Sequence, residues 1–224
     1  MPPTLRPPLL PLLGDGWIGR YGAAGDALTW EGPRPGVDWH RHDWRSVRVL
    51  VLKEGRLEVR EVRRRRWLLY RTTRTRQDRA PDEVAGMRAT LLVVFMALWA
   101  WLGSGSGLHA HDALVPALAD RPSRRTAQRW LCRLAPDGAV LQQALRTAVI
   151  ERFEPQPVEL LFPGGLSPPG AVRCRRWKDP APVYSFALAL AFLFEGARAL
   201  STRLPVLLAE AHRRLDRPLG SAAP

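Results

Sequence analysis

Cysteine is scarce in this sequence: Cys132 and Cys174 are the only two among 224 residues, and they lie far apart. Without a CxxC pair the chain has neither a disulfide framework nor a four-cysteine zinc site. Cys132 falls within a helical pattern, where we expect a small packing residue. The N-terminus is broken by prolines and has no long apolar stretch typical of a secretory signal. These absences predict a cytoplasmic protein without a bound metal.

Very long apolar runs and the common catalytic motifs are also missing. The two longest apolar runs, 91–102 and 183–194, are shorter than the roughly 20 residues that a membrane-spanning helix needs. They favour helix packing or dimerisation over membrane insertion. The sequence has no Walker-type loop, GxSxG or HExxH, and its acidic residues are scattered rather than grouped as a two-metal nuclease needs. We therefore expect no enzymatic activity and no cofactor.

Lysine is nearly absent, because Lys53 and Lys178 are the only two, and arginine supplies the positive charge. With 34 basic and 21 acidic residues, the formal net charge is +13. A protein this basic is expected to meet polyanions, and arginine suits bidentate contacts to phosphate and guanine. A GC-rich genome would also favour arginine. Two other interpretations therefore stay open: a basic helical protein at a membrane, and a helical interaction module that binds no nucleic acid.

The stretch from Ala110 to Pro136 has the pattern of two short helices with a tight break between them. The first covers roughly residues 110–119, and Pro122 prevents it from continuing. Ser123 is a natural N-cap for the second helix, whose apolar residues recur at helical spacing and form a buried stripe. That stripe consists of Ala127, Trp130, Leu131 and Leu134. The arrangement predicts a helix-turn-helix whose second helix enters a DNA major groove.

The polar face of the predicted second helix carries side chains of the types that contact DNA. Arginine and glutamine read guanine and adenine edges, and arginine also binds phosphates. The residues expected to read base edges are Arg124, Arg125 and Gln128. The residues expected to contact phosphates are Arg129 and Arg133, together with the arginine run Arg63, Arg64, Arg65 and Arg66. Double-stranded DNA is the predicted partner, and a homodimer is a further expectation.

Two runs with strand alternation precede the arginine run. VRVLVL and LEVREV, joined by a glycine-containing turn, predict a β-hairpin within residues 47–70. Trp67 and Tyr70, at its end, are expected to dock on the core. A helix is expected over 81–103, with Glu83 in its first turn. The first 43 residues are rich in proline and glycine, a composition that does not support long helices or strands.

These segments together predict a mainly α-helical protein with a small N-terminal β-hairpin and a helix-turn-helix core. The predicted parts are a Pro/Gly/Trp-rich segment (1–45), the basic hairpin (46–80), the helix-turn-helix domain (81–155), a Pro/Gly-rich linker (156–182), a C-terminal helical pair (183–215) and a disordered tail (216–224).

The order of features over roughly residues 45–170 resembles a family of uncharacterised bacterial mobile-element proteins associated with transposases. The likeness consists of the hairpin with its arginine run, the apolar helix, and PSRRTAQRWLCRL followed by RFEPQPVELLFPGGLSPP. It implies a zinc ribbon before a helix-turn-helix, and DNA binding in the context of transposition. The paired cysteines of such a ribbon are absent here, so zinc binding is not carried over and the hairpin must be held by packing.

Overall fold

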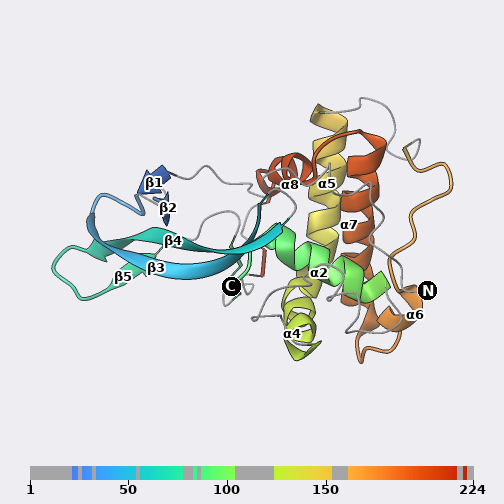
Figure 1. The fold of residues 1–224 in the computed structure, drawn as a ribbon, viewed down its shortest axis with the longest axis horizontal. Helices are drawn as coiled ribbons and strands as arrows, with labels where there is room; N and C mark the ends of the chain where they lie inside the picture. The colour runs from blue at the N-terminus through green and yellow to red at the C-terminus, as the bar shows by residue number, and fades with distance from the viewer. Residues whose placement is uncertain are drawn as a thin grey trace.

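A computed structural model describes residues 22–24, 27–31, 34–53, 56–77, 83–84, 87–103, 124–152, 161–215 and 219–220 of the protein. Figure 1 shows a body of helices and a β-sheet that projects from it as a long arm. The base of the arm lies against the helices, and its far end points away from them. We call these two parts the body and the arm.

The arm is a five-stranded mixed sheet in the order β1-β2-β4-β3, with β5 also pairing with β4. Its strands are β1 (Gly22–Ala24), β2 (Ala27–Trp30), β3 (Trp39–Lys53), β4 (Arg56–Leu69) and β5 (Thr75–Gln77). β2 runs parallel to β4, and the other pairs are antiparallel. The predicted fold class, mainly α with a small hairpin, is therefore wrong, because β3 and β4 are 15 and 14 residues long and have three further strands beside them. The prediction of no long helix or strand in the first 43 residues is wrong at the end of that segment, because the 15-residue strand β3 begins at Trp39.

The side chains of β3 and β4 alternate between the two faces of the sheet, as the sequence pattern predicts. Val49, Val51 and Val62 share one face and form a small buried cluster. Leu50 points to the opposite face and joins the main core of the body. Its amide donates to the carbonyl of Arg88 at 2.8 Å, and its carbonyl accepts from the amide of Thr90 at 2.9 Å. This backbone pairing fixes the base of the arm to the start of α2.

The body packs its helices around one apolar core. They are α2 (Leu91–Gly103), α4 (Arg124–Leu134), the 3-10 helix η2 (Ala135–Asp137), α5 (Gly138–Arg152), α6 (Ala171–Cys174), α7 (Pro180–Ala199) and α8 (Leu204–His212). α5 and α7 lie side by side (Figure 1). α2 begins at Leu91, later than predicted, and Glu83 lies outside it in a β-bridge with Thr90. The predicted helix start is wrong because the backbone before Leu91 pairs with the sheet.

The apolar run 183–194 lies within α7, which at 20 residues is long and apolar enough to cross a membrane by length and composition. The prediction that length excludes a membrane span here is therefore wrong, because the helix that contains this run is longer than the run itself. Of the most apolar 18-residue stretch of this helix, 61% is buried inside the body. Phe186 packs edge-on against Phe95 of α2, with ring centroids 5.6 Å apart. Burial against α5 and α2 is what a core helix shows, and it leaves this run unavailable for the dimerisation considered above.

The predicted linker and tail both contain residues that pack on the body. α6 lies within the predicted linker, and Cys174 at its end is fully buried. The Arg173 side chain donates to the carbonyl of Trp101, near the C-terminus of α2, where a cation is favourable. Leu219 and Gly220 are buried, although the sequence predicts disorder for them. These contacts join distant parts of the chain and leave no local signal in the sequence.

Candidate nucleic-acid interface

α4 is the predicted second helix of the helix-turn-helix, and its apolar stripe is confirmed. Ala127, Leu131 and Leu134 are fully buried, and Trp130 is nearly so. The stripe packs against α2 and α7. The predicted first helix, residues 110–119, and the N-cap Ser123 lie outside the described residues. Of the predicted helix-turn-helix, only the second helix therefore lies among the described residues, and its apolar face holds it on the body.

The opposite face of α4 carries the predicted base-reading residues. Arg125 and Arg129 are exposed, and Gln128 lies half-buried between them. Together with Cys132 and Arg133 they line a shallow hollow of about 550 Å³. Within the described part of the chain, neither Arg125 nor Arg129 forms an ion pair. Arg124 is the first residue of the helix, and its side chain is outside the described part.

Cys132 is exposed on this polar face, so the prediction of a packing residue is wrong. At helical spacing it follows Gln128 and Arg129 rather than the apolar stripe. Cys174 is the buried cysteine, and burial raises the pKa of its thiol despite the hydrogen bond from the backbone and the charge of Arg173, which act in the opposite direction. One thiol of the protein is thus open to solvent and the other is protected.

Arg133 has a partner within the protein, unlike Arg125 and Arg129. Its Nε donates to the carbonyl oxygen of Gly220 at 2.9 Å. The amide of the same glycine donates to the carboxylate of Asp137 at 2.6 Å. Gly220 has a φ of +70°, and a Cβ there would lie 2.6 Å from the Val84 side chain. Because its guanidinium is committed to this contact, we leave Arg133 out of the proposed interface.

The arginine run lies in β4, in the arm, and the structure places it against the protein's own carboxylates rather than beside α4. Arg64 pairs with Glu83 at 2.6 Å in a largely buried site. Arg66 pairs with Asp43 at 2.6 Å across the strands. The run alternates between the two faces of the sheet, since neighbouring strand residues point in opposite directions.

Arg65 and Arg63 complete the run and are also turned toward the protein. Arg65 lies over the ring of Trp44, 3.9 Å from its centroid, and faces Glu31 at 3.5 Å. The Nε of Arg63 is buried and has no hydrogen-bond partner among the described residues. The run thus serves the sheet's own packing, and we do not include it in the interface.

The far end of the arm holds a feature that the sequence interpretation missed. A hollow of about 710 Å³ is lined by Glu31, Arg34, Trp39, His40, Arg41 and Trp67. Arg41 reaches into it to pair with Glu31 at 2.7 Å. Trp67 is buried within the arm but joins neither buried apolar cluster, and Tyr70 is 55% exposed, so the prediction that the two dock on the core is wrong. The alternation of aromatic and charged residues in WHRHDW is the one signal that could have indicated this site.

The described residues contain no group of three or more histidine, cysteine, aspartate or glutamate side chains placed to hold a metal ion. His40 instead packs edge-on against Tyr70, with ring centroids 5.3 Å apart.

Comparison with protein-family models, with curated proteins and with solved structures finds no match for this chain. The resemblance to transposase-associated proteins therefore stays a prediction from the sequence, and the case for a function rests on the geometry of α4.

Proposed function

We propose that the protein binds double-stranded DNA through the polar face of α4. The observation that carries the proposal is that this short helix has one buried apolar face and one exposed basic face. One face is buried in the body, and the other presents Arg125 and Arg129 to solvent with no ion pair among the described residues. A helix fixed by its back with unneutralised arginines in front is suited to a major groove.

Each residue of this face has a role that follows from its position. Arg125, near the N-terminal end of α4, suits the two acceptors of a guanine edge, and Gln128, three residues on, suits adenine. Arg129 lies one turn after Arg125 and suits a phosphate. The net charge of +13 adds a general attraction to DNA that does not depend on sequence.

Selection of binding sites from a random duplex pool, followed by a salt titration, tests the proposal. We expect enriched sites and an affinity that falls steeply with salt, since each phosphate contact releases roughly one counterion. Arg125→Ala should lower affinity for the selected site by about 1–3 kcal/mol and affect a non-specific duplex less. Arg129→Ala should reduce the salt slope by about one.

Arg175→Ala is the matched control, because Arg175 is an exposed arginine that follows α6, outside α4. It should leave the preference for the selected site unchanged. If no duplex binds at about 100 mM salt, or if Arg125→Ala and Arg175→Ala behave alike, the proposal is wrong. Flotation of the protein with anionic liposomes in the absence of DNA binding would favour the membrane interpretation instead.

A further inference from the structure

The hollow at the far end of the arm, which the proposed function does not use, combines aromatic rings with positive charge. Trp39 contributes to it from the start of β3, and Trp67 contributes from β4. Arg34 and Arg41 line it as well, and Glu31 is the only carboxylate among the described lining residues. Its volume of about 710 Å³ lies within the range of sites that hold small organic ligands. This lining suits a ligand that has both a flat ring and a negative charge.

The loop before β3 holds Trp39 in a fixed position. The amide of Trp39 donates to the carbonyl of Gly36 at 3.1 Å, and its carbonyl accepts from the Nε of Arg34 at 2.7 Å. Gly36 lies against the indole, because a Cβ there would be 3.4 Å from Cδ1 of the ring. The ring itself is half-buried, so part of it is open to solvent. A ring that is already in place lowers the entropy cost of binding a ligand.

The two arginines of the hollow carry more charge than its carboxylate neutralises. The hydrogen bonds of Arg34 go to the carbonyls of Trp39 and Val37, and it has no carboxylate partner among the described residues. Arg41 pairs with Glu31 at 2.7 Å, but its side chain is 69% exposed. A guanidinium has five N–H donors, so both arginines keep donors for an anion. The hollow therefore suits a phosphate group.

Trp67 adds an unused donor beside the hollow. Its side chain is only 4% exposed, and its Nε1 has no hydrogen-bond partner among the described residues. A buried N–H without an acceptor is costly and uncommon in folded proteins. A ligand that brings an acceptor to this side of the hollow would remove that cost.

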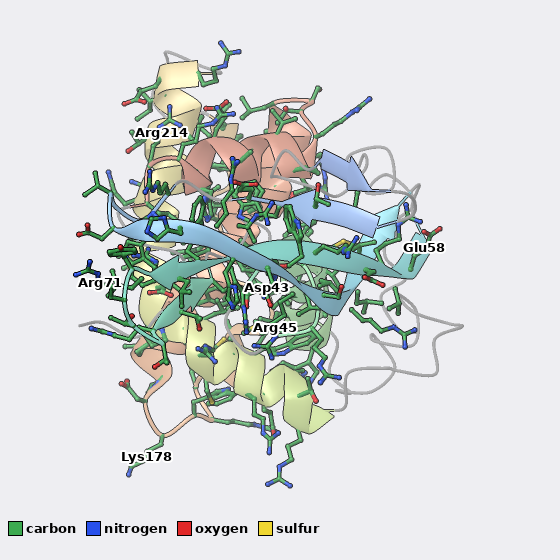
Figure 2. All side chains as sticks on the ribbon, turned by 90° about the vertical axis from the view of Figure 1, so that its left-hand side faces the viewer. Asp43, Arg45, Glu58, Arg71, Lys178 and Arg214 are labelled. Atoms are coloured by element: carbon green, nitrogen blue, oxygen red, sulfur yellow. The ribbon has the colours of Figure 1, made fainter. Side chains whose placement is uncertain are left out.

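The turn between β4 and β5 extends the positive charge beyond the hollow. Arg71 and Arg74 are exposed in this turn. The amide of Tyr70 donates to the carbonyl of Asp38 at 2.8 Å, so the turn lies beside the loop that holds Trp39. Figure 2 has the far end of the arm toward the viewer and shows Arg71 projecting outward from the ribbon. A ligand with several phosphates in a row would meet these arginines after leaving the hollow.

We propose that the hollow binds an unpaired nucleotide of a single nucleic-acid strand. The base stacks on Trp39, its phosphate contacts Arg34 and Arg41, and the next phosphates lie along the turn between β4 and β5. Proteins that bind single strands combine a positively charged groove with aromatic rings on which bases stack. The bases of a duplex are stacked inside it, so a duplex offers no free base to this site. The site is separate from α4, which belongs to the body.

Fluorescence anisotropy with a labelled oligodeoxythymidylate of about ten nucleotides, at about 100 mM salt, tests this proposal. An abasic strand of the same length keeps the phosphates and lacks the bases. The native chain should bind the intact strand about tenfold or more tightly than the abasic strand. Equal binding of the two strands overturns the proposal. Thymidine monophosphate should displace the strand only at concentrations far above the Kd of the strand; displacement at a similar concentration would overturn the strand as the ligand.

Variants of the hollow identify the residues responsible. Trp39→Ala should remove the advantage of the intact strand, and Trp39→Phe should keep most of it. Trp177→Ala is the matched control, because Trp177 is a half-buried tryptophan that follows α6, outside the hollow. Arg41→Ala should weaken binding of both strands, lower the salt slope by about 0.7 and keep the native unfolding transition, since the side chain is exposed. If Trp39→Ala and Trp177→Ala behave alike, or if Arg41→Ala leaves the salt slope unchanged, the proposal is wrong.

Duplex binding through α4 is measured on the same variants and separates the two proposals. Arg125→Ala should weaken binding of the selected duplex and leave binding of the single strand unchanged. Trp39→Ala should have the reverse effect. A preference for the intact strand in a chain that binds no duplex would contradict only the proposal for α4. Specific duplex binding in a chain without that preference would contradict only the proposal for the hollow.

Discussion

Arg64 and Glu83 form an ion pair 2.6 Å long whose side chains are only 13% and 2% exposed. Arg64 belongs to β4 in the arm, and Glu83 lies in the segment that leads to α2 in the body. The Nε of Arg64 donates to the same carboxylate oxygen at 2.9 Å. This pair and the backbone pairing of Leu50 are two polar links between the described residues of the two parts.

Glu83→Gln should lower the free energy of unfolding by about 3–5 kcal/mol, because it leaves the Arg64 charge buried without its counter-charge. Urea unfolding measures the change. Glu58→Gln is the control: its partner Arg60 is 3.9 Å away and the two side chains are 41% and 35% exposed, so the cost should stay below about 1 kcal/mol. Equal costs for the two variants would show that the Arg64–Glu83 pair has no special role.

Gly170→Ala should destabilise the body strongly. Gly170 has a φ of +62°, and a Cβ there would lie 2.0 Å from the carbonyl oxygen of Leu102. Strain and displacement together should cost about 3 kcal/mol or more. Gly165 has a similar φ of +72° but open space around it. Gly165→Ala should therefore cost only about 1 kcal/mol. Chemical denaturation of both variants distinguishes the cost of the close contact with Leu102 from the cost of the positive φ.

Arg133→Ala and Arg129→Ala should have opposite consequences although both residues lie on α4. Arg133 holds the carbonyl of Gly220, so its loss should lower the free energy of unfolding by about 1.5–3 kcal/mol and change DNA affinity little. Arg129 is exposed, so its loss should leave stability unchanged and weaken DNA binding. Thermal unfolding and a binding titration on each variant check this. A stable Arg133→Ala variant with weak DNA binding would return Arg133 to the interface.

Stability should decline in mildly acidic solution because of His212. Burial lowers the pKa of this imidazole below its ordinary value of 6.5. The unfolded chain therefore takes up the proton at a higher pH than the folded protein does. His212 makes its full contribution to the free energy of unfolding when the pH is above the ordinary pKa of histidine. That contribution declines as the pH falls through the ordinary pKa toward the lowered pKa of the folded protein. Urea midpoints at about pH 7.5 and pH 5.5 should differ less for His212→Gln than for the native chain; an equal difference would assign the effect to other groups.

Local spacing predicts part of this structure well. The buried stripe of α4 and the faces of Val49, Val51 and Val62 follow from helical and strand periodicity, which short stretches of sequence display. The arm as a five-stranded sheet does not follow, because β2 reaches β4 through a parallel pairing of segments about 34 residues apart, such as Leu28 with Val62. No short-range pattern encodes that contact.

The predicted DNA-binding site also has features that follow from local spacing and features that depend on distant contacts. The exposure of Arg125 and Arg129 follows from their spacing on α4. The occupation of Arg133 by Gly220, 87 residues away, does not. The dense charge of the arginine run indicates a phosphate-binding surface when it is considered alone. The carboxylates that neutralise it come from three other segments, at Glu31, Asp43 and Glu83.

Alkylation of Cys132 tests the role of α4 most directly. Cys132 is exposed within the hollow formed by Arg125 and Arg129, whereas Cys174 is buried, so a thiol reagent should modify one site in the folded protein. We expect saturating duplex DNA to slow modification of Cys132 several-fold, and high salt to restore the rate as the DNA dissociates. An unchanged rate while DNA is fully bound would place the DNA elsewhere on the protein and contradict the account.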